Sequence, residues 1–144
     1  MTEIRKAIES DLSSLRSLEE IVFDEADLNM FDRHFFDDEG SICYVLEDEK
    51  QIVGSILVEI GPERAYVASI GIIDQFRRKG YGSSFMQIVE KDLRERGVPR
   101  ITLHVKTGNI GAVVCYILNG FIVDDIPRHF YRDGSHAYFM TKKL

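Results

Sequence analysis

Residues 75–82 read QFRRKGYG, and they stand between a predicted strand over 65–73 and a predicted helix over 80–96. A helix begins with backbone N–H groups that have no partner within the helix, and its aligned peptide dipoles make that end partly positive. Gly80 and Gly82 carry no Cβ, so a ligand can approach the backbone closely there. Because three cations directly precede Gly80, the stretch predicts a pyrophosphate site. The alternative is a helix that begins at a glycine beside solvated arginines.

The stretch does not match the two common nucleotide-binding motifs. A dinucleotide fingerprint needs G-x-G-x-x-G, and a Walker loop needs G-K-[ST]. Residues 75–82 contain neither pattern. A domain of the P-loop or dinucleotide-binding class is therefore disfavoured.

Two spaced motifs resemble a known family. The pattern R-x-x-G-x-G over 77–82, placed after a strand, resembles the coenzyme A signature of the GNAT N-acetyltransferase superfamily. A second match, N-x-x-A-x-x-x-Y-x-x-x-G-F over 109–121, follows at the separation usual in that family. The likeness extends over essentially the whole chain. Its pattern is most similar to N-terminal (protein α-amine) acetyltransferases of the ribosomal-protein-alanine type.

The order of predicted elements fits that likeness. Strands are predicted over 4–8, 41–46, 51–60, 65–73, 100–105, 121–126 and 137–141, and helices from Ser10 or Asp11 onward, over 80–96 and over 110–118. Residues 24–40 read as an acidic loop or a short helix. Such a mixed order indicates an α/β or α+β domain. The resemblance implies the GNAT fold: a mixed, mostly antiparallel sheet of about seven strands, flanked by about four helices. Its parallel strands, here 65–73 and 100–105, splay apart to admit the coenzyme.

Length and composition predict one domain over 1–144. The chain is 44% apolar and 29% charged, and it needs no disulfide or metal to fold at this size. Cys43 and Cys115 lack the spacing of a metal site, so we expect reduced thiols and no metal. The sequence shows no membrane-spanning run and no export signal, which predicts a cytoplasmic protein. We expect a monomer or a homodimer.

Charge is unevenly distributed along the chain. Residues 1–60 hold 16 Asp and Glu against 5 Lys and Arg, whereas residues 61–144 hold 8 against 13, for a net charge of −6. The acidic balance argues against nucleic-acid binding. The second part could hold an anion while the first faces a cation, although ordinary surface charge also explains the division.

The resemblance assigns residues to the coenzyme. They are Ile70, Gly71, Ile72, Arg77, Arg78, Lys79, Gly80, Tyr81, Gly82, Ser83, Asn109, Ala112 and Tyr116. The resemblance also implies an oxyanion-binding main-chain N–H near Ile72. Acetyl-CoA is the implied acyl donor.

Tyr116 matches the general acid of the family. The thiolate that leaves acetyl-CoA benefits from protonation, and a phenol with a pKa near 10 can hold a proton at neutral pH and donate it. The alternative role for this tyrosine is to pack its helix against the sheet.

His104 and Tyr66 match catalytic positions of N-terminal acetyltransferases. Strand alternation points His104 away from its neighbours Leu103 and Val105. A histidine with a pKa near 6.5 accepts a proton more readily from an α-amine, near 7.7–8, than from lysine, near 10.4. This comparison favours a peptide or protein N-terminus as acceptor. A buried strand histidine with satisfied hydrogen bonds is the alternative.

Two further segments bear on the acceptor. Phe130 and Tyr131 lie in a stretch that resembles the tyrosine-bearing hairpin over the substrate backbone, with one hydroxyl missing. Phe23, Met30 and Phe31 are candidates for an apolar substrate pocket, but the carboxylates between them would also suit a small cationic amine such as a polyamine. The sequence therefore predicts an acetyl-CoA-dependent N-acetyltransferase acting on an N-terminal α-amine. A small-amine acetyltransferase and a non-catalytic CoA-binding sensor are the alternatives.

Overall fold

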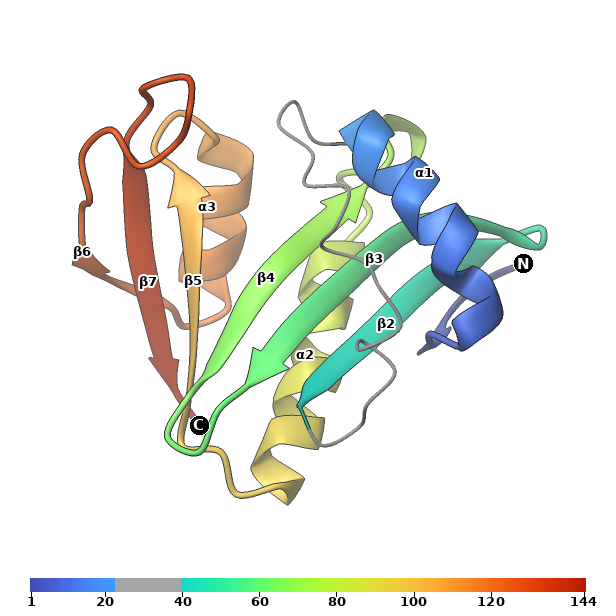
Figure 1. Cartoon of the computed structure of the whole chain (residues 1–144), viewed down its shortest axis with the longest axis horizontal. Helices are drawn as coiled ribbons and strands as arrows, with labels where there is room; N and C mark the ends of the chain where they lie inside the picture. Colours follow the sequence, from blue (N-terminus) through green and yellow to red (C-terminus); the bar gives the residue numbers. More distant parts are fainter. Residues whose placement is uncertain (23–39) are drawn as a thin grey trace.

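The computed structural model describes residues 1–22 and 40–144. Its elements, in chain order, are β1 (Thr2–Lys6), α1 (Leu12–Val22), β2 (Ser41–Asp48), β3 (Gln51–Ile60), β4 (Ala65–Ile72), α2 (Tyr81–Glu95), β5 (Arg100–Lys106), α3 (Ile110–Leu118), β6 (Ile122–Asp125) and β7 (Ala137–Lys143). Short 3-10 helices, Glu9–Asp11 and Asp74–Phe76, precede α1 and follow β4. Figure 1 shows α1 in front of the sheet and α2 and α3 behind it.

The seven strands form one sheet in the order β1-β2-β3-β4-β5-β7-β6. Every neighbouring pair is antiparallel except β4 and β5, which are parallel. The predicted mixed, mostly antiparallel sheet is therefore confirmed. Assignment of residues 1–144 to one domain stays a prediction.

Strands β4 and β5 separate along their length, as predicted. Parallel pairing is limited to Ala65 with Ile101 and Tyr66 with Thr102. A bulge causes β4 to turn away, because Val58 of β3 pairs with Val67 while Leu57 pairs with Ser69. In Figure 1 the two strands lie close together near the C-terminus and diverge towards the opposite end of the sheet.

The core lies mainly between the sheet and α2. Fully buried side chains of α2 occur at three- and four-residue steps, which places Phe85, Met86, Val89 and Leu93 on one face. Alternate residues of β5, Ile101, Leu103 and Val105, belong to the same apolar cluster. Since this packing holds one face of β5, His104 must point to the other face.

Some element boundaries differ from the predictions. The first strand ends at Lys6 rather than at Ile8, and the helical turn before α1 begins at Glu9. Asp11 does not cap that turn from its N-terminal side; its carboxylate accepts a hydrogen bond from Ile8 N at 2.8 Å and pairs with Arg5. The described residues contain three α-helices rather than about four, and most of the predicted acidic loop or short helix over 24–40 lies outside them.

Candidate active site

The gap between β4 and β5 is lined by the last residues of β4. Ile70, Gly71 and Ile72 pair with β3 on one side. Their other backbone edge faces β5 beyond the last recorded β4–β5 pair. Backbone polar groups at this edge are therefore available to a ligand that enters the gap.

The turn before α2 is shaped to hold an anion. Arg78 at φ +63 and Gly80 at φ +85 are both left-handed, so the backbone curls around the start of the helix. The hydrogen bond from Ser84 N to Gly80 O, at 3.0 Å, is at the first turn of α2. The N–H groups of Tyr81, Gly82 and Ser83 precede it and can bind a phosphate.

The cations of this turn have separate local contacts. Arg77 donates from Nε to Ile72 O at 2.8 Å, and its Nη1 lies 2.7 Å from Asp74 Oδ1. Arg77 therefore braces the turn against the end of β4. The ammonium of Lys79 lies 5.5 Å from the ring centre of Phe76.

Helix α3 forms the wall beside this turn. The side chain of Asn109 caps α3 by accepting a hydrogen bond from Ala112 N at 3.3 Å. At the other end, Asn119 donates to Ser83 Oγ at 3.0 Å, which ties α3 to the start of α2. A Cβ on Gly82 would lie 3.6 Å from Cys115 Sγ, an ordinary contact distance. The two predicted motifs thus meet in space.

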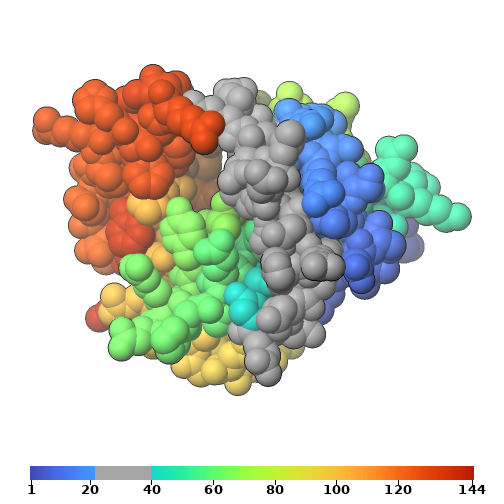
Figure 2. All heavy atoms as spheres, viewed as in Figure 1, coloured from blue at the N-terminus to red at the C-terminus, as the bar shows by residue number. Residues whose placement is uncertain are grey.

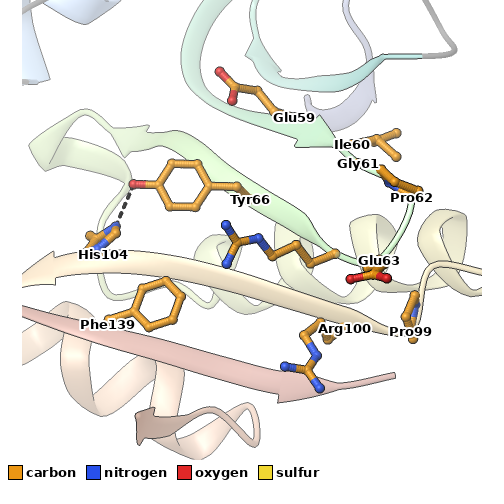
Figure 3. Close-up of a pocket in the computed structure, with 11 residues that line it drawn as sticks. Glu59, Ile60, Gly61, Pro62, Glu63, Tyr66, Pro99, Arg100, His104 and Phe139 are labelled. Carbon is orange, nitrogen blue, oxygen red and sulfur yellow. Dashed lines mark hydrogen bonds between the residues drawn. The ribbon is translucent and has the colours of Figure 1, made fainter. Parts of the chain in front are cut away.

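Tyr66 and His104 face each other across the start of the diverging strands. The distance from Tyr66 Oη to His104 Nδ1 is 2.8 Å, and the donor depends on the tautomer of the ring (Figure 3). Partial burial lowers the pKa of His104 below its ordinary value, although Asp125 opposes this shift. Burial raises the pKa of Tyr66, so this phenol keeps its proton at neutral pH.

Two phenyl rings hold the imidazole of His104. Phe130 stacks on it with ring centres 4.2 Å apart and planes at 16°. Phe139, which pairs with His104 across β5 and β7, is tilted at 4.8 Å. The rings limit both the rotation of His104 and the water around it, which favours the neutral imidazole.

Tyr131 and Tyr116 are both held as neutral phenols. Burial, with contributions from Tyr66 and Asp133, raises the pKa of Tyr131 to about 12. Tyr116 is buried in α3, and burial is the first cause of its raised pKa, with further contributions from Cys115 and Tyr131. Tyr116 therefore retains its proton at neutral pH, as a general acid must.

The connection between β6 and β7 holds Phe130 and Tyr131 by internal bonds. Asp133 accepts hydrogen bonds from Ser135 and from Lys106 Nζ, the latter at 3.0 Å, and these contacts lower its pKa. The Lys106 ammonium also lies 5.2 Å from the ring centre of Tyr131. The lysine at the end of β5 thus fixes this connection next to His104.

A groove of about 1110 Å³ opens beside the Tyr66–His104 pair. It is lined by Glu59, Ile60, Gly61, Pro62, Glu63, Arg64, Tyr66, Pro99, Arg100, His104 and Phe139. Figure 3 shows Tyr66, His104 and Phe139 at one end, and Glu63, Pro99 and Arg100 at the other. In Figure 2 the green atoms of the β3–β4 hairpin and the orange-red atoms between β6 and β7 lie on this same face.

Most of the groove could not be identified from the sequence. Glu59, Glu63, Arg64 and Arg100 lie in or beside the hairpin and the start of β5, where charge is usual and gives no signal. Phe139 could be placed beside His104 only once the register of β7 against β5 was known. The candidate pocket residues Phe23, Met30 and Phe31 lie outside the described residues.

No group of three or more potential metal ligands, and no helix long and apolar enough to span a membrane, occurs within 1–22 and 40–144.

Comparison with known proteins shows that the chain is similar to one family of enzymes. The model of the Acetyltransferase (GNAT) family matches residues 6–121. An N-alpha-acetyltransferase of Sulfurisphaera tokodaii is 30% identical over 114 residues, which cover 70% of this chain and 68% of the relative.

Solved structures show the same fold. The ribosomal-protein-S18-alanine N-acetyltransferase from Escherichia coli superposes with a TM-score of 0.85 at 21% identity, covering 100% of this chain and 94% of that one. The NatC complex bound to Gag peptide and CoA contains a chain with a TM-score of 0.87 at 18% identity, covering 99% and 98%.

Proposed function

This chain belongs to the GNAT family of acetyltransferases, and we propose that it transfers the acetyl group of acetyl-CoA to the α-amine of a peptide or protein N-terminus. The observation that carries the proposal is the 2.8 Å contact between Tyr66 and His104, placed on the groove where β4 and β5 begin to diverge. His104, the proposed proton acceptor, thereby lies next to both the gap between β4 and β5 and the open groove.

The turn before α2 supports the coenzyme assignment. The N–H groups of Tyr81, Gly82 and Ser83 would bind the pyrophosphate, and a backbone without a Cβ at Gly80 and Gly82 leaves room for it. The free backbone edge of 70–72 would hold the pantetheine arm and the acyl oxygen. Acetyl-CoA supplies an activated thioester whose sulfur can leave as a thiolate.

His104 would take the proton that the attacking amine loses. With the ring proton on Nδ1, Nε2 is the free basic nitrogen; with the ring proton on Nε2, Tyr66 donates to Nδ1 and can pass a proton along that bond. A new C–N bond forms as the C–S bond breaks. Tyr116, whose raised pKa keeps it protonated, would donate its proton to the departing sulfur.

The difference in pKa between the two kinds of amine favours an α-amine acceptor. An α-amine lies about two units below a lysine side chain, so it transfers its proton to the imidazole more readily, and the lowered pKa of His104 makes transfer from a lysine harder still. The names of the relatives also support an α-amine acceptor, since the Sulfurisphaera relative is an N-alpha-acetyltransferase. The Escherichia coli structure belongs to an enzyme named for the alanine of a ribosomal protein.

A small cationic amine is the second candidate acceptor. The groove places the carboxylates of Glu59 and Glu63 on the same side of the sheet as His104, where they could attract a polyamine. Arg64 and Arg100 line the same groove and offset this attraction. We therefore place this candidate second.

The experiment is a thiol-release assay with a matched set of acceptors. Peptides with free N-termini, the same peptides with blocked N-termini, and spermidine are each incubated with acetyl-CoA. We expect turnover with free N-termini that is lost when they are blocked. Turnover on spermidine alone would support the small-amine candidate. Tight coenzyme binding without transfer to any amine would indicate a non-catalytic sensor.

A further inference from the structure

Three cationic residues lie in a row across the sheet where β4 and β5 are paired. Ala65 of β4 pairs with Ile101 of β5. Arg64 and Arg100 directly precede these two residues in the chain. On the other side of β5, Arg100 pairs with Lys143 of β7. Neighbouring strands lie about 5 Å apart, so these residues are adjacent, and we call Arg64, Arg100 and Lys143 the cation row.

The cation row lies on the face of the sheet that carries the groove. Arg64 and Arg100 both line the groove. Strand alternation puts Arg100 and His104, which are four residues apart, on the same face. Lys143 lies directly opposite Arg100, and cross-strand partners share a face, so its side chain starts from that face too. Figure 3 shows Arg100 at the opposite end of the groove from His104.

No counter-ion for the cation row occurs among the described residues. All three side chains are exposed, and within 1–22 and 40–144 none of them makes a hydrogen bond or an ion pair. Glu63 lines the same end of the groove, where it is one carboxylate against three cations. Like charges directly opposite each other on neighbouring strands destabilise a sheet. A row whose repulsion no ion pair relieves is therefore suited to bind an anion from outside.

The groove carries the opposite charge beside the Tyr66–His104 pair. Glu59 pairs with Tyr66 across β3 and β4, so its carboxylate starts from the same face next to that pair. Burial is the main cause of the raised pKa of Tyr66, and the charge of Glu59 adds to it. The groove therefore offers a carboxylate to an incoming ammonium and, further along, cations to a carboxylate.

The spacing of the two ends matches the first residues of an extended peptide. Strand residues advance about 3.3 Å each, which puts the Cα of Arg100 about 13 Å from that of His104. The same advance puts the Cα of Arg64 about 7 Å from that of Tyr66. An extended peptide advances about 3.3 to 3.6 Å per residue, so with its α-amine at His104 its third and fourth residues reach the cation row.

We propose that the cation row makes the third or fourth residue of the acceptor a specificity position that favours Asp or Glu. This inference rests on the proposed function, because it takes the α-amine to lie at His104. A guanidinium can bind a carboxylate through two parallel hydrogen bonds, and a neighbouring cation strengthens that binding. The C-terminal carboxylate of a tripeptide carries the same chemistry to the same place.

Peptide binding and peptide acetylation, measured in parallel, test this specificity. The probes are six-residue peptides with a free N-terminus and a labelled, amidated C-terminus, each with Asp or Asn at one of positions 2 to 5. Fluorescence anisotropy gives the Kd for protein saturated with CoA, which cannot transfer an acetyl group, and thiol release from acetyl-CoA gives kcat/KM. Both should favour Asp by at least about tenfold at position 3 or 4. A tripeptide and its amide distinguish a main-chain carboxylate from a side-chain one.

Variants of the two arginines assign the preference to the cation row. Arg64→Gln and Arg100→Gln should each lower the Asp-to-Asn ratio towards one, and the double variant Arg64→Glu, Arg100→Glu should favour Lys over Asp. The matched control is Arg94→Gln, an exposed arginine of α2 behind the sheet, which should keep the wild-type ratio. Each ratio compares two peptides on one protein, so a loss of folded protein does not change it.

The specificity and the proposed function fail in different ways. Turnover of the peptides with equal Kd and equal kcat/KM for Asp and Asn at every position would overturn the specificity and leave the proposed function standing. An Asp preference that survives both arginine variants would overturn it as well. An Asp preference in Kd that both variants lose, without transfer to any peptide, would overturn the proposed function alone. No binding of any peptide would overturn both.

Discussion

At the scale of single residues, the site depends on how His104 is enclosed. Its ring is bonded to Tyr66, stacked on Phe130 and tilted against Phe139. This enclosure removes water from the imidazolium form and lowers the pKa of His104. His104 is therefore neutral, and able to accept a proton, over a wider acidic range than an ordinary histidine.

Replacing His104 with Ala should remove one limb of the pH–rate profile. In the wild type, kcat/KM should rise with pH through the pKa of His104, which lies below the ordinary histidine value of about 6.5. In His104→Ala, only the ascent at about 7.7–8 from the acceptor α-amine should remain, and the rate should fall about 10²- to 10⁴-fold. Thiol release measured across this pH range checks both effects. An acid limb that stays in place in the variant would exclude His104 as the base.

Tyr116 should contribute to the rate and not to coenzyme binding. Tyr116→Phe removes the only proton that this buried side chain can donate, while its ring keeps its edge contact with Phe121. We expect kcat to fall about 10²-fold or more and the Kd for acetyl-CoA to stay nearly unchanged. Single-turnover rates and calorimetry separate the two quantities. Equal losses in rate and binding would show that Tyr116 only packs.

At the scale of elements, the start of α2 is the part that we propose binds the coenzyme. Left-handed Arg78 and Gly80 turn the chain so that the first N–H groups of α2 face outward. Asn119 of α3 fixes that start through Ser83. The anion site is therefore a property of the two helices together.

Two substitutions at Gly82 separate the effects of size and charge. A Cβ there would lie 3.6 Å from Cys115 Sγ, so Gly82→Ala fits the protein itself, and its loss of coenzyme affinity reports only the room that the pyrophosphate needs. Gly82→Asp adds a carboxylate next to the pyrophosphate site and should raise the Kd for acetyl-CoA at least about tenfold. Calorimetry with acetyl-CoA measures both. Equal affinity in Gly82→Asp and wild type would place the pyrophosphate elsewhere.

Local patterns predicted the elements well and their contacts poorly. The apolar spacing of α2 and the alternation around His104 follow from periods of 3.6 and 2 residues, so they could be read from the chain. The bulge at Ala68 that turns β4 away has no such signal, because it depends on the register against β3. The stacking of Phe130 on His104 likewise depends on how the connection between β6 and β7 folds back.

At the scale of the whole molecule, the sheet separates the residues proposed to bind the coenzyme from those proposed to bind the acceptor. Helices α2 and α3 lie behind it, whereas the groove opens on the other face (Figures 1 and 3). A buried ion pair joins helix α2 to strand β7. Lys142 Nζ of β7 lies 2.7 Å from Glu90 Oε1 of α2, and Glu90 is almost fully buried. The pair fixes α2 to the strand that carries Phe139.

Loss of the Lys142 charge alone should destabilise the molecule more than loss of both charges of the pair. Lys142→Met leaves the Glu90 carboxylate buried without its cation and should lower the free energy of unfolding by about 2 to 4 kcal/mol. The double variant with Glu90→Gln, which removes both charges, should recover part of that loss. Urea unfolding at 25 °C compares the three proteins. A single variant as stable as wild type would show that Glu90 is solvated.

The acceptor assignment is tested most directly by locating the acetyl group on a peptide that has one free α-amine and one lysine. After incubation with acetyl-CoA at neutral pH, fragmentation by mass spectrometry identifies the modified nitrogen. We expect acetylation at the N-terminal α-amine, because the weakened base at His104 deprotonates that group more easily than an ε-amine. Acetylation on the lysine alone would contradict the account.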